Sequence, residues 1–318
     1  MIEKLLEESE NVDIEMLTVD SLKKLLLGFE KKINKNQKLR MKYPDEPEKF
    51  MDSEVELHEE LNALYALSAS PELYPTFVQA GSVQSLLGMV AHENTDVSLA
   101  AVGLLQELTD PETILESEET TMPLIDALLE GQCLELIVQN MARLDETNEE
   151  DSQGVHDSLS TLDNLLEVQP SLALTIVEKT HILKYLLTRL RVKNFDQNKL
   201  YCSELLSMLL QKAPAVSKRL ANVAGVDDGL DALLQIVSQY RKRDPDTSEE
   251  QECVQNIFLS LCTALMDADN KNHFRSCEGM ELMVRCLKEN KYAASCASRA
   301  ITYAITNNRF VFSPLYTM

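Results

Sequence analysis

The chain has 318 residues, with 52 Asp and Glu against 30 Lys and Arg, and a formal net charge of −22 at pH 7. Such a charge repels phosphate, so we do not expect direct binding to duplex nucleic acid, which depends on neutralising phosphates with Lys and Arg. Nine Gly, ten Pro and no Trp accompany abundant Leu, Ala, Glu, Met and Lys. Helix formers therefore dominate, and an all-α protein is expected.

Seven cysteines are scattered along the chain without a C-x-x-C pair. An odd, scattered set is typical of reduced thiols in an intracellular protein. No apolar run approaches the roughly 20 residues that cross a bilayer, and the acidic start MIEKLLEESE resembles neither a signal nor a transit peptide. We therefore expect a soluble protein of the cytosol or nucleus that does not bind a membrane.

Two segments precede the repetitive part of the chain. Residues 1–20 form an acidic lead-in that is expected to be flexible, and residues 21–80 are expected to form an N-terminal helical cap. Within the cap, Leu22, Leu25, Leu26 and Phe29 recur at the spacing of one helical face.

Prolines and a serine divide this cap. The prolines of YPDEPEKF force a turn, because proline lacks an amide donor and restricts the residue before it. Ser70, followed by Pro71, marks a further helix start, with a capping hydroxyl ahead of a proline at the first helical position.

Residues 81–306 repeat a pair of apolar helices, in units that start near residues 81, 131, 181, 225 and 279. The first unit has an apolar helix after Gly81, a polar turn from His92 to Thr95, and a second helix from Asp96. The spacing of about 44 to 54 residues between starts is near or just above that of armadillo and HEAT repeats.

The last helix of each unit is apolar on more than one side, as Leu104, Leu105 and Leu108 illustrate. One helical hairpin could not bury such a helix, whereas stacked neighbours could. The predicted fold is an all-α, armadillo/HEAT-like, right-handed superhelical solenoid; an ordinary helical bundle is the alternative. No linker rich in Pro, Gly or Ser divides the chain, so one continuous array is preferred over two domains, followed by a divergent tail at residues 307–318.

Residues that could carry catalysis show no recognised pattern. The histidines lie apart without an H-E-x-x-H motif, and no phosphate-binding or nucleophile-elbow motif occurs. Carboxylate pairs such as Glu118–Glu119 lie in polar turns, which favours solvated loops over acid/base chemistry. Tyr201 and Met208 lie in apolar stripes and are expected in the core. We expect no enzymatic activity, no catalytic residue, no cofactor and no metal.

Two basic clusters interrupt the acidic surface, one from Lys31 to Lys42 and a smaller one from Arg241 to Arg243. Either could be an import signal or a docking patch. Solvated faces that balance nearby acids are the favoured interpretation.

The segments YPDEPEKFM and HENTDVS…LLQELTD resemble the beta-catenin-like family of nuclear armadillo-repeat proteins that associate with the spliceosome. Later stretches, among them LIDALLEGQCLELIVQNMARLDE and NKLYCSELLSMLLQ, are similar to the same family in the same order, from about Ser21 to about Ile305. The resemblance implies a non-enzymatic scaffold in pre-mRNA splicing, located in the nucleus, with the cytoplasm as a second location.

The resemblance also implies partners. These are splicing-complex proteins with basic, nuclear-localisation-type segments, above all the cell-division-cycle-five-like protein of the Prp-nineteen-type complex, and in vertebrates a B-cell cytidine deaminase. The family's Arg-rich leader has no counterpart here, and NNRFVFSPLYTM resembles neither the family nor a repeat. We therefore expect a truncated isoform, a fragment or an imperfect gene model, whose tail either caps the last repeat or leaves its apolar face exposed.

In armadillo repeats the third helix lines the concave groove, and peptide-binding members carry a Trp and an Asn on it. Aligning the leucines assigns two sets of positions in this chain. The residues near the Asn-type position are Glu107, Asn164, Met208, Thr263 and Tyr303, and those near the Trp-type position are Gly103, Ser160, Glu204, Leu259 and Arg299.

Asn164 alone matches the peptide-binding pattern, and the chain has no Trp, so importin-like clamping of a peptide backbone is not expected. An acidic groove that recognises basic side chains is the weaker substitute. The candidate partner-binding residues are Gly103, Glu107, Ser160, Asp163, Asn164 and Glu204. For each of them the alternative is an exposed helix position without a role, and for the whole chain it is a structural protein that self-associates into a homo-oligomer.

Overall fold

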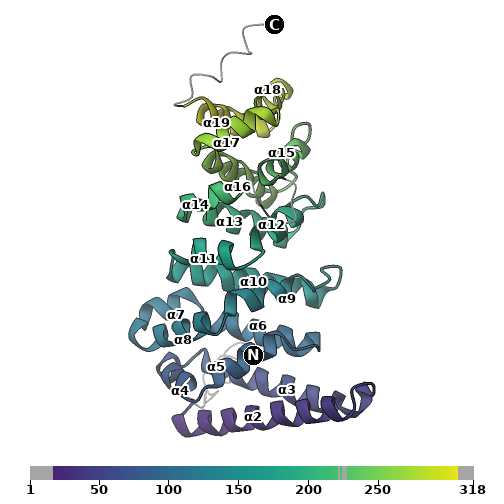
Figure 1. Cartoon of the computed structure of the whole chain (residues 1–318), viewed down its shortest axis with the longest axis vertical. Coiled ribbons are helices and arrows are strands. Elements are labelled where there is room, and N and C mark those ends of the chain that lie inside the picture. The colour runs from purple at the N-terminus through teal and green to yellow at the C-terminus, as the bar shows by residue number, and fades with distance from the viewer. Residues whose placement is uncertain (1–16, 221–222, 224–227, 307–318) are drawn as a thin grey trace, which may run out of the picture. The chain divides into compact units, whose positions relative to one another are not determined.

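The computed structural model describes residues 17–220, 223 and 228–306 (Figure 1). In this part of the chain every regular element is a helix and there is no strand, so the predicted all-α class is confirmed. The chain divides into two compact units, Met1–Cys133 and Leu134–Met318. Three predictions concern residues outside this part of the chain: the flexibility of residues 1–16, the repeat start near Gly225 and the divergent tail at 307–318.

The first unit consists of the cap and the first repeat pair. Its helices are α2 (Val19–Lys42), η1 (Pro47–Lys49), α3 (Met51–Leu64), η2 (Tyr65–Leu67), η3 (Pro71–Leu73), α4 (Tyr74–Gln79), α5 (Ser82–Val90), α6 (Thr95–Leu108), α7 (Pro111–Glu116) and α8 (Glu118–Glu130). Helix α2 packs on α3, α3 and α5 pack on α6, and α4 packs on α8. Leu22, Leu26 and Phe29 lie in the core as their spacing predicted, while Leu25 is half-buried.

Caps set the starts of these helices. Thr18 and Ser21 form a capping box, so α2 begins at Val19, before the expected boundary of the cap at residue 21. Asn94 caps α6 by accepting the Val97 amide at 3.3 Å, so this helix begins at Thr95 rather than Asp96.

The start predicted at Ser70 is partly wrong. Pro71 does open a helix, but it is the short 3-10 helix η3, and the Ser70 side chain makes no capping hydrogen bond. Gly81, immediately before α5, has a φ of +74°, a conformation that glycine adopts without the strain a Cβ would bring.

The second unit repeats one arrangement. Its helices are α9 (Cys133–Met141), α10 (Glu149–Val168), α11 (Leu172–Lys179), α12 (Ile182–Leu190), α13 (Gln197–Lys212), α14 (Pro214–Leu220), α15 (Gly229–Gln239), α16 (Ser248–Ala264), α17 (Ala268–Ser276), α18 (Gly279–Glu289) and α19 (Ala293–Ile305). Helix α9 begins at the last residue of the first unit.

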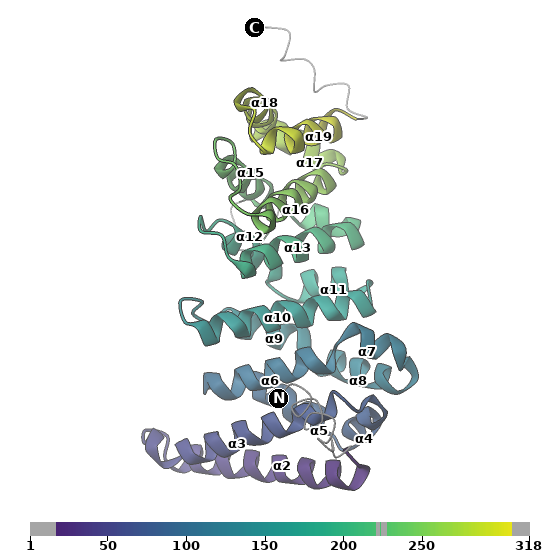
Figure 2. The same cartoon turned by 180° about the vertical axis from the view of Figure 1, so that it is seen from behind.

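Three rows of stacked helices run through the second unit. Helices α11, α14 and α17 contact one another in succession, as do α12, α15 and α18, and as do α10, α13, α16 and α19 (Figures 1 and 2). From α11 onward, each layer thus has three helices. The sequence analysis predicted only a pair of helices in each repeat and so missed the short first helix of these layers, α11, α14 and α17. Helices α10 and α13 bury leucines on more than one side, which explains their apolar pattern.

Candidate functional site

The third-helix face of the second unit, formed by α10, α13, α16 and α19, carries the groove positions assigned from the leucines. On α13, the side chains of Tyr201, Glu204 and Met208 recur at i, i+3 and i+7, so they share one face of the helix. Each of these three residues is half-buried. The prediction that Tyr201 and Met208 belong to the core is therefore wrong, because both side chains stay partly accessible to solvent.

An acid cluster lies on this face, made of Asp163 on α10, Glu204 on α13 and Glu252 on α16. Burial raises the pKa of Glu204, and the negative charges of Glu252 and Asp163 raise it further. Burial, followed by the charge of Glu167, likewise raises the pKa of Asp163, although the charge of Lys212 and a hydrogen bond with Tyr201 act in the opposite direction. These carboxylates therefore repel one another where water screens them incompletely, and a cation would be favoured beside them.

Tyr201 joins two of the predicted residues within this cluster. Its side chain hydrogen-bonds with Ser160 and with Asp163, and its pKa is raised, mainly by burial. On its other side the ring meets the imidazole of His156, with 5.2 Å between ring centroids. Tyr201 thus links α13 to the Asp163 carboxyl group on α10.

An apolar cleft of about 750 Å³ lies farther along the same helices. Its lining includes the groove positions Leu259, Thr263 and Tyr303, with Met266 beside them. The exposed fraction is 70% for Met266 and 41% for Leu259 and Tyr303, high values for side chains of this kind. The face thus has an acidic part and an apolar part, both on α13 and α16.

The structure brings some of the predicted residues together and leaves others apart. Ser160, Asp163 and Glu204 gather around Tyr201. Asn164 follows on α10 and is half-buried. Gly103 and Glu107 belong to α6 of the first unit, where Gly103 is buried and Glu107 is exposed.

Sequence reasoning missed Tyr201, Glu252 and the apolar cleft. The sequence could have predicted that Tyr201 lies beside Glu204, because it stands three residues before Glu204 on the same helical face. Glu252 could not be found in this way, because its place beside Glu204 depends on how α13 packs against α16.

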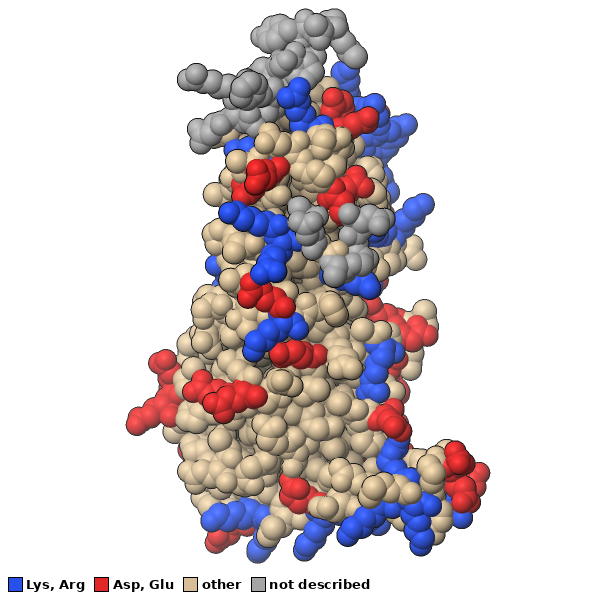
Figure 3. Space-filling model, in the orientation of Figure 1, with Lys and Arg blue, Asp and Glu red and all other residues tan. Residues whose placement is uncertain are grey.

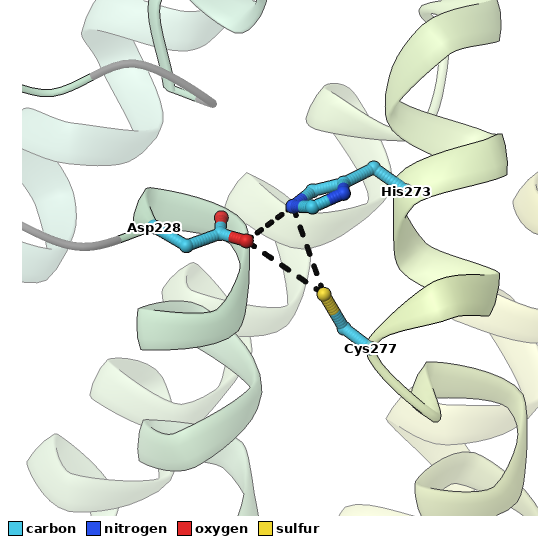
Figure 4. Close-up of side chains that lie close together, drawn as sticks. All are labelled: Asp228, His273 and Cys277. Carbon is cyan, nitrogen blue, oxygen red and sulfur yellow. Dashed lines mark hydrogen bonds and ion pairs between the residues drawn. The ribbon is translucent and has the colours of Figure 1, made fainter.

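One group in the described residues has the side chains to hold a metal ion: Asp228, His273 and Cys277 (Figure 4). The Cys277 Sγ atom lies 3.7 Å from Asp228 Oδ2 and 3.6 Å from His273 Nε2, and His273 Nε2 is in direct contact with the same carboxylate oxygen. Burial alone would raise the pKa of Asp228, but the hydrogen bond with His273 and those from backbone amides lower it. The other four histidines do not belong to such a group.

The basic cluster on α2 is balanced by acids. Figure 3 shows Lys and Arg gathered over α2 with Asp and Glu among them. Lys35 pairs with Glu56 at 2.7 Å, Lys32 pairs with Glu60, and Arg40 pairs with both Glu54 and Glu93. This favours the solvated-face interpretation over a docking patch. Among the described residues, no helix combines the length and apolarity needed to span a membrane.

Comparison with known proteins gives one family. The model of the family "Catenin-beta-like, Arm-motif containing nuclear" matches residues 1–312, a wider range than the predicted Ser21 to Ile305. Human Beta-catenin-like protein 1 is 45% identical over 290 residues, 91% of this chain and 51% of the relative. The Beta-catenin-like protein 1 homolog of Schizosaccharomyces pombe is 33% identical over 303 residues, 95% and 51% of the two chains. This chain spans about half the length of the curated relatives it matches.

Solved structures confirm the armadillo type of fold. A structure of computationally designed armadillo repeat proteins for modular peptide recognition matches with a TM-score of 0.55 at 13% identity, over 78% of this chain and 93% of the other. An engineered protein matches with a TM-score of 0.53 at 15% identity, over 80% and 92%. At such identities the likeness establishes the fold alone, an all-α solenoid of stacked helical repeats.

Proposed function

Because this chain belongs to the catenin-beta-like, Arm-motif containing nuclear family, we propose that its scaffold binds basic, nuclear-localisation-type segments of proteins that act in pre-mRNA splicing. An armadillo-type scaffold of this family is a helical-repeat interaction protein. The observation that carries the proposal is the acid cluster of Asp163, Glu204 and Glu252 on the third-helix face, where burial outweighs the charge of Lys212 and keeps the pKa of Asp163 raised.

A basic side chain of the partner would lie between Asp163 and Glu204. Its charge would offset the burial and the neighbouring negative charges that raise the pKa of both carboxyl groups, and charge-assisted hydrogen bonds would orient it. A neighbouring apolar side chain of the partner would enter the cleft beside Leu259 and Tyr303. The ligand class that suits this face is therefore an extended segment with Lys or Arg next to an apolar residue.

The charge of the whole chain supports the same ligand class. A net charge of −22 attracts basic segments over a distance, which speeds their association and weakens with salt. The proposed function includes no catalytic step, and the proposed location is the nucleus, in keeping with the family description. The proposed partners are splicing-complex proteins with basic segments, such as the cell-division-cycle-five-like protein.

Charge neutralisation on the third-helix face tests the basic-segment proposal. Asp163→Asn and Glu204→Gln should each weaken binding of a Lys/Arg-rich peptide by about three- to tenfold at low salt, since each removes one partly screened ionic contact. Fluorescence anisotropy of a labelled peptide measures this at low and at high salt. Glu281→Gln, at an exposed position of α18, is the matched control and should leave the affinity unchanged.

Two results would contradict the basic-segment proposal. One is an affinity that does not respond to salt, and the other is an affinity equally insensitive to Glu204→Gln and Glu281→Gln. The splicing part needs its own measurement, a pull-down from nuclear extract with the chain as bait. The unaltered chain should retain splicing proteins, and the double variant Asp163→Asn, Glu204→Gln should retain much less of them.

A second candidate function is self-association through the apolar cleft. The exposure of Met266, Leu259 and Tyr303 favours it, because side chains of this size usually lie against other protein. The occupant of the cleft would then be a second copy of the chain, and the oligomeric state in solution distinguishes this candidate from the first.

A further inference from the structure

The Asp228, His273 and Cys277 group connects two helices of the second unit. Asp228 is the N-cap of α15, His273 lies in the last turn of α17, and Cys277 follows α17 directly. His273 and Cys277 are four residues apart, and Asp228 lies 45 residues before His273 in the sequence. Packing of α15 against α17 brings the three side chains to one point (Figure 4).

Neighbouring hydrogen bonds fix which atoms face that point. Asp228 Oδ1 accepts the amides of Leu230 and Asp231, at 2.9 and 3.2 Å, so Oδ2 is the atom left toward the group. Ser276 Oγ donates to the His273 carbonyl at 2.7 Å and lies 3.3 Å from His273 Nδ1. Its hydroxyl is therefore an acceptor for an Nδ1 proton, so Nε2 is the ring nitrogen that faces Asp228 and Cys277.

When His273 Nε2 carries a proton it donates to Asp228 Oδ2, and the Cys277 thiol donates to the same oxygen at 3.7 Å. A metal ion would take the place of both protons. The thiol sulfur lies 3.6 Å from His273 Nε2, so the three ligand atoms surround one point. Ligands at about 2.0 and 2.3 Å from a tetrahedral zinc ion lie about 3.5 Å apart, which matches the two distances to sulfur.

We propose that Asp228, His273 and Cys277 bind one Zn²⁺ ion, with water as the fourth ligand. Carboxylate oxygen, imidazole nitrogen and thiolate sulfur are the ligand types that zinc takes in proteins. Zinc would replace the thiol proton, and a small rotation of the half-exposed His273 side chain would open its contact with Asp228 to ligand spacing. The Ser276 hydroxyl would hold the imidazole in the metal-binding orientation.

The site would act as a clamp between two helices. One ion would link the start of α15 to the end of α17, and so stabilise the second unit by binding the folded state alone. The inference replaces the expectation of no metal with a specific set of ligands, and it is independent of the basic-segment proposal because none of the three residues lies on the third-helix face.

Protection of Cys277 from alkylation tests the site on the unaltered chain. Cys277 is half-buried, whereas the other six cysteines are buried, so a maleimide should label Cys277 first. One equivalent of Zn²⁺ should slow this labelling at least tenfold, and Mg²⁺ should not. Peptide mapping by mass spectrometry identifies the labelled residue. Equal labelling rates with and without Zn²⁺ would overturn the proposal.

Variants test the individual ligands. His273→Gln should abolish the protection by Zn²⁺, while His156→Gln, at a histidine outside the group, should retain it. With Co²⁺ in place of zinc, the unaltered chain should show a sulfur-to-cobalt charge-transfer band that Cys277→Ser lacks, with circular dichroism as the check that the variants fold. Protection that persists in His273→Gln would refute the assignment of His273.

Discussion

At the scale of the residue, His92 shows how a histidine that could suggest chemistry serves the fold. Its Nδ1 accepts the Asn94 amide at 3.1 Å, and its Nε2 lies 3.1 Å from Asn36 Oδ1. Both contacts fit a neutral imidazole with its proton on Nε2. Burial lowers the pKa of His92, and the positive charge of Arg40 lowers it further. The residue therefore closes the turn before α6 in its neutral form.

The consequence is a dependence of stability on pH. The folded-state pKa of His92 is below the ordinary value of about 6.5. The contribution of His92 to the free energy of unfolding is therefore fully present above about pH 6.5, and it is lost as the pH falls through the folded-state pKa. His92→Gln should therefore lower the stability at pH 7.5 more than at pH 5. Urea unfolding at the two pH values measures the difference.

The exposed His181, at the start of α12, provides the control for His92. His181→Gln should leave the pH dependence of unfolding as it is in the unaltered chain. A pH dependence that is the same in His92→Gln as in the unaltered chain would show that the imidazole of His92 is not the group responsible.

At the scale of the element, close approach between helices places glycines where a side chain would not fit. A Cβ on Gly279, at the start of α18, would lie 2.3 Å from the ring of Phe274 on α17, and this ring is buried. Gly279→Ala should therefore destabilise the chain by about 1–3 kcal/mol, because either the ring or the helix must move.

Gly88, inside α5, is the matched comparison for Gly279. A Cβ there would meet nothing within 4 Å, and the residue is exposed. Gly88→Ala should stabilise the chain by about 0.5–1 kcal/mol, since alanine favours a helix more than glycine does. Thermal unfolding of both variants gives the two signs, and a destabilisation by Gly88→Ala as large as that by Gly279→Ala would contradict the argument.

At the scale of the whole molecule, the net charge and the apolar cleft have opposite effects on self-association of the chain. A charge of −22 keeps copies of the chain apart, and salt weakens this repulsion. We expect a monomer at low salt by light scattering. If the cleft binds a second copy, dimers should appear as salt increases, and Met266→Glu should suppress them. A monomer at all salt concentrations would exclude self-association and leave the cleft to a partner.

Periodicity in the sequence determined the fold class and the pair of longer helices in each repeat, because local spacing alone decides which face of a helix is apolar. The spacing of Leu104, Leu105 and Leu108 predicted a helix buried on two sides, and such a helix requires stacked neighbours. The acidic character of the candidate face could also be predicted, since Glu204 stands at a groove position counted from the leucines and Asp163 precedes another, Asn164.

Tertiary structure alone decided which distant residues meet. Glu252 joins Glu204 because α13 packs on α16, and Tyr201 lies beside His156 and Ser160 because α13 packs on α10. The ligand group of Asp228, His273 and Cys277 depends in the same way on α15 packing against α17. Sequence spacing fixes neighbours three or four positions apart on one helix, whereas contacts between helices depend on how side chains interdigitate, which no local pattern records.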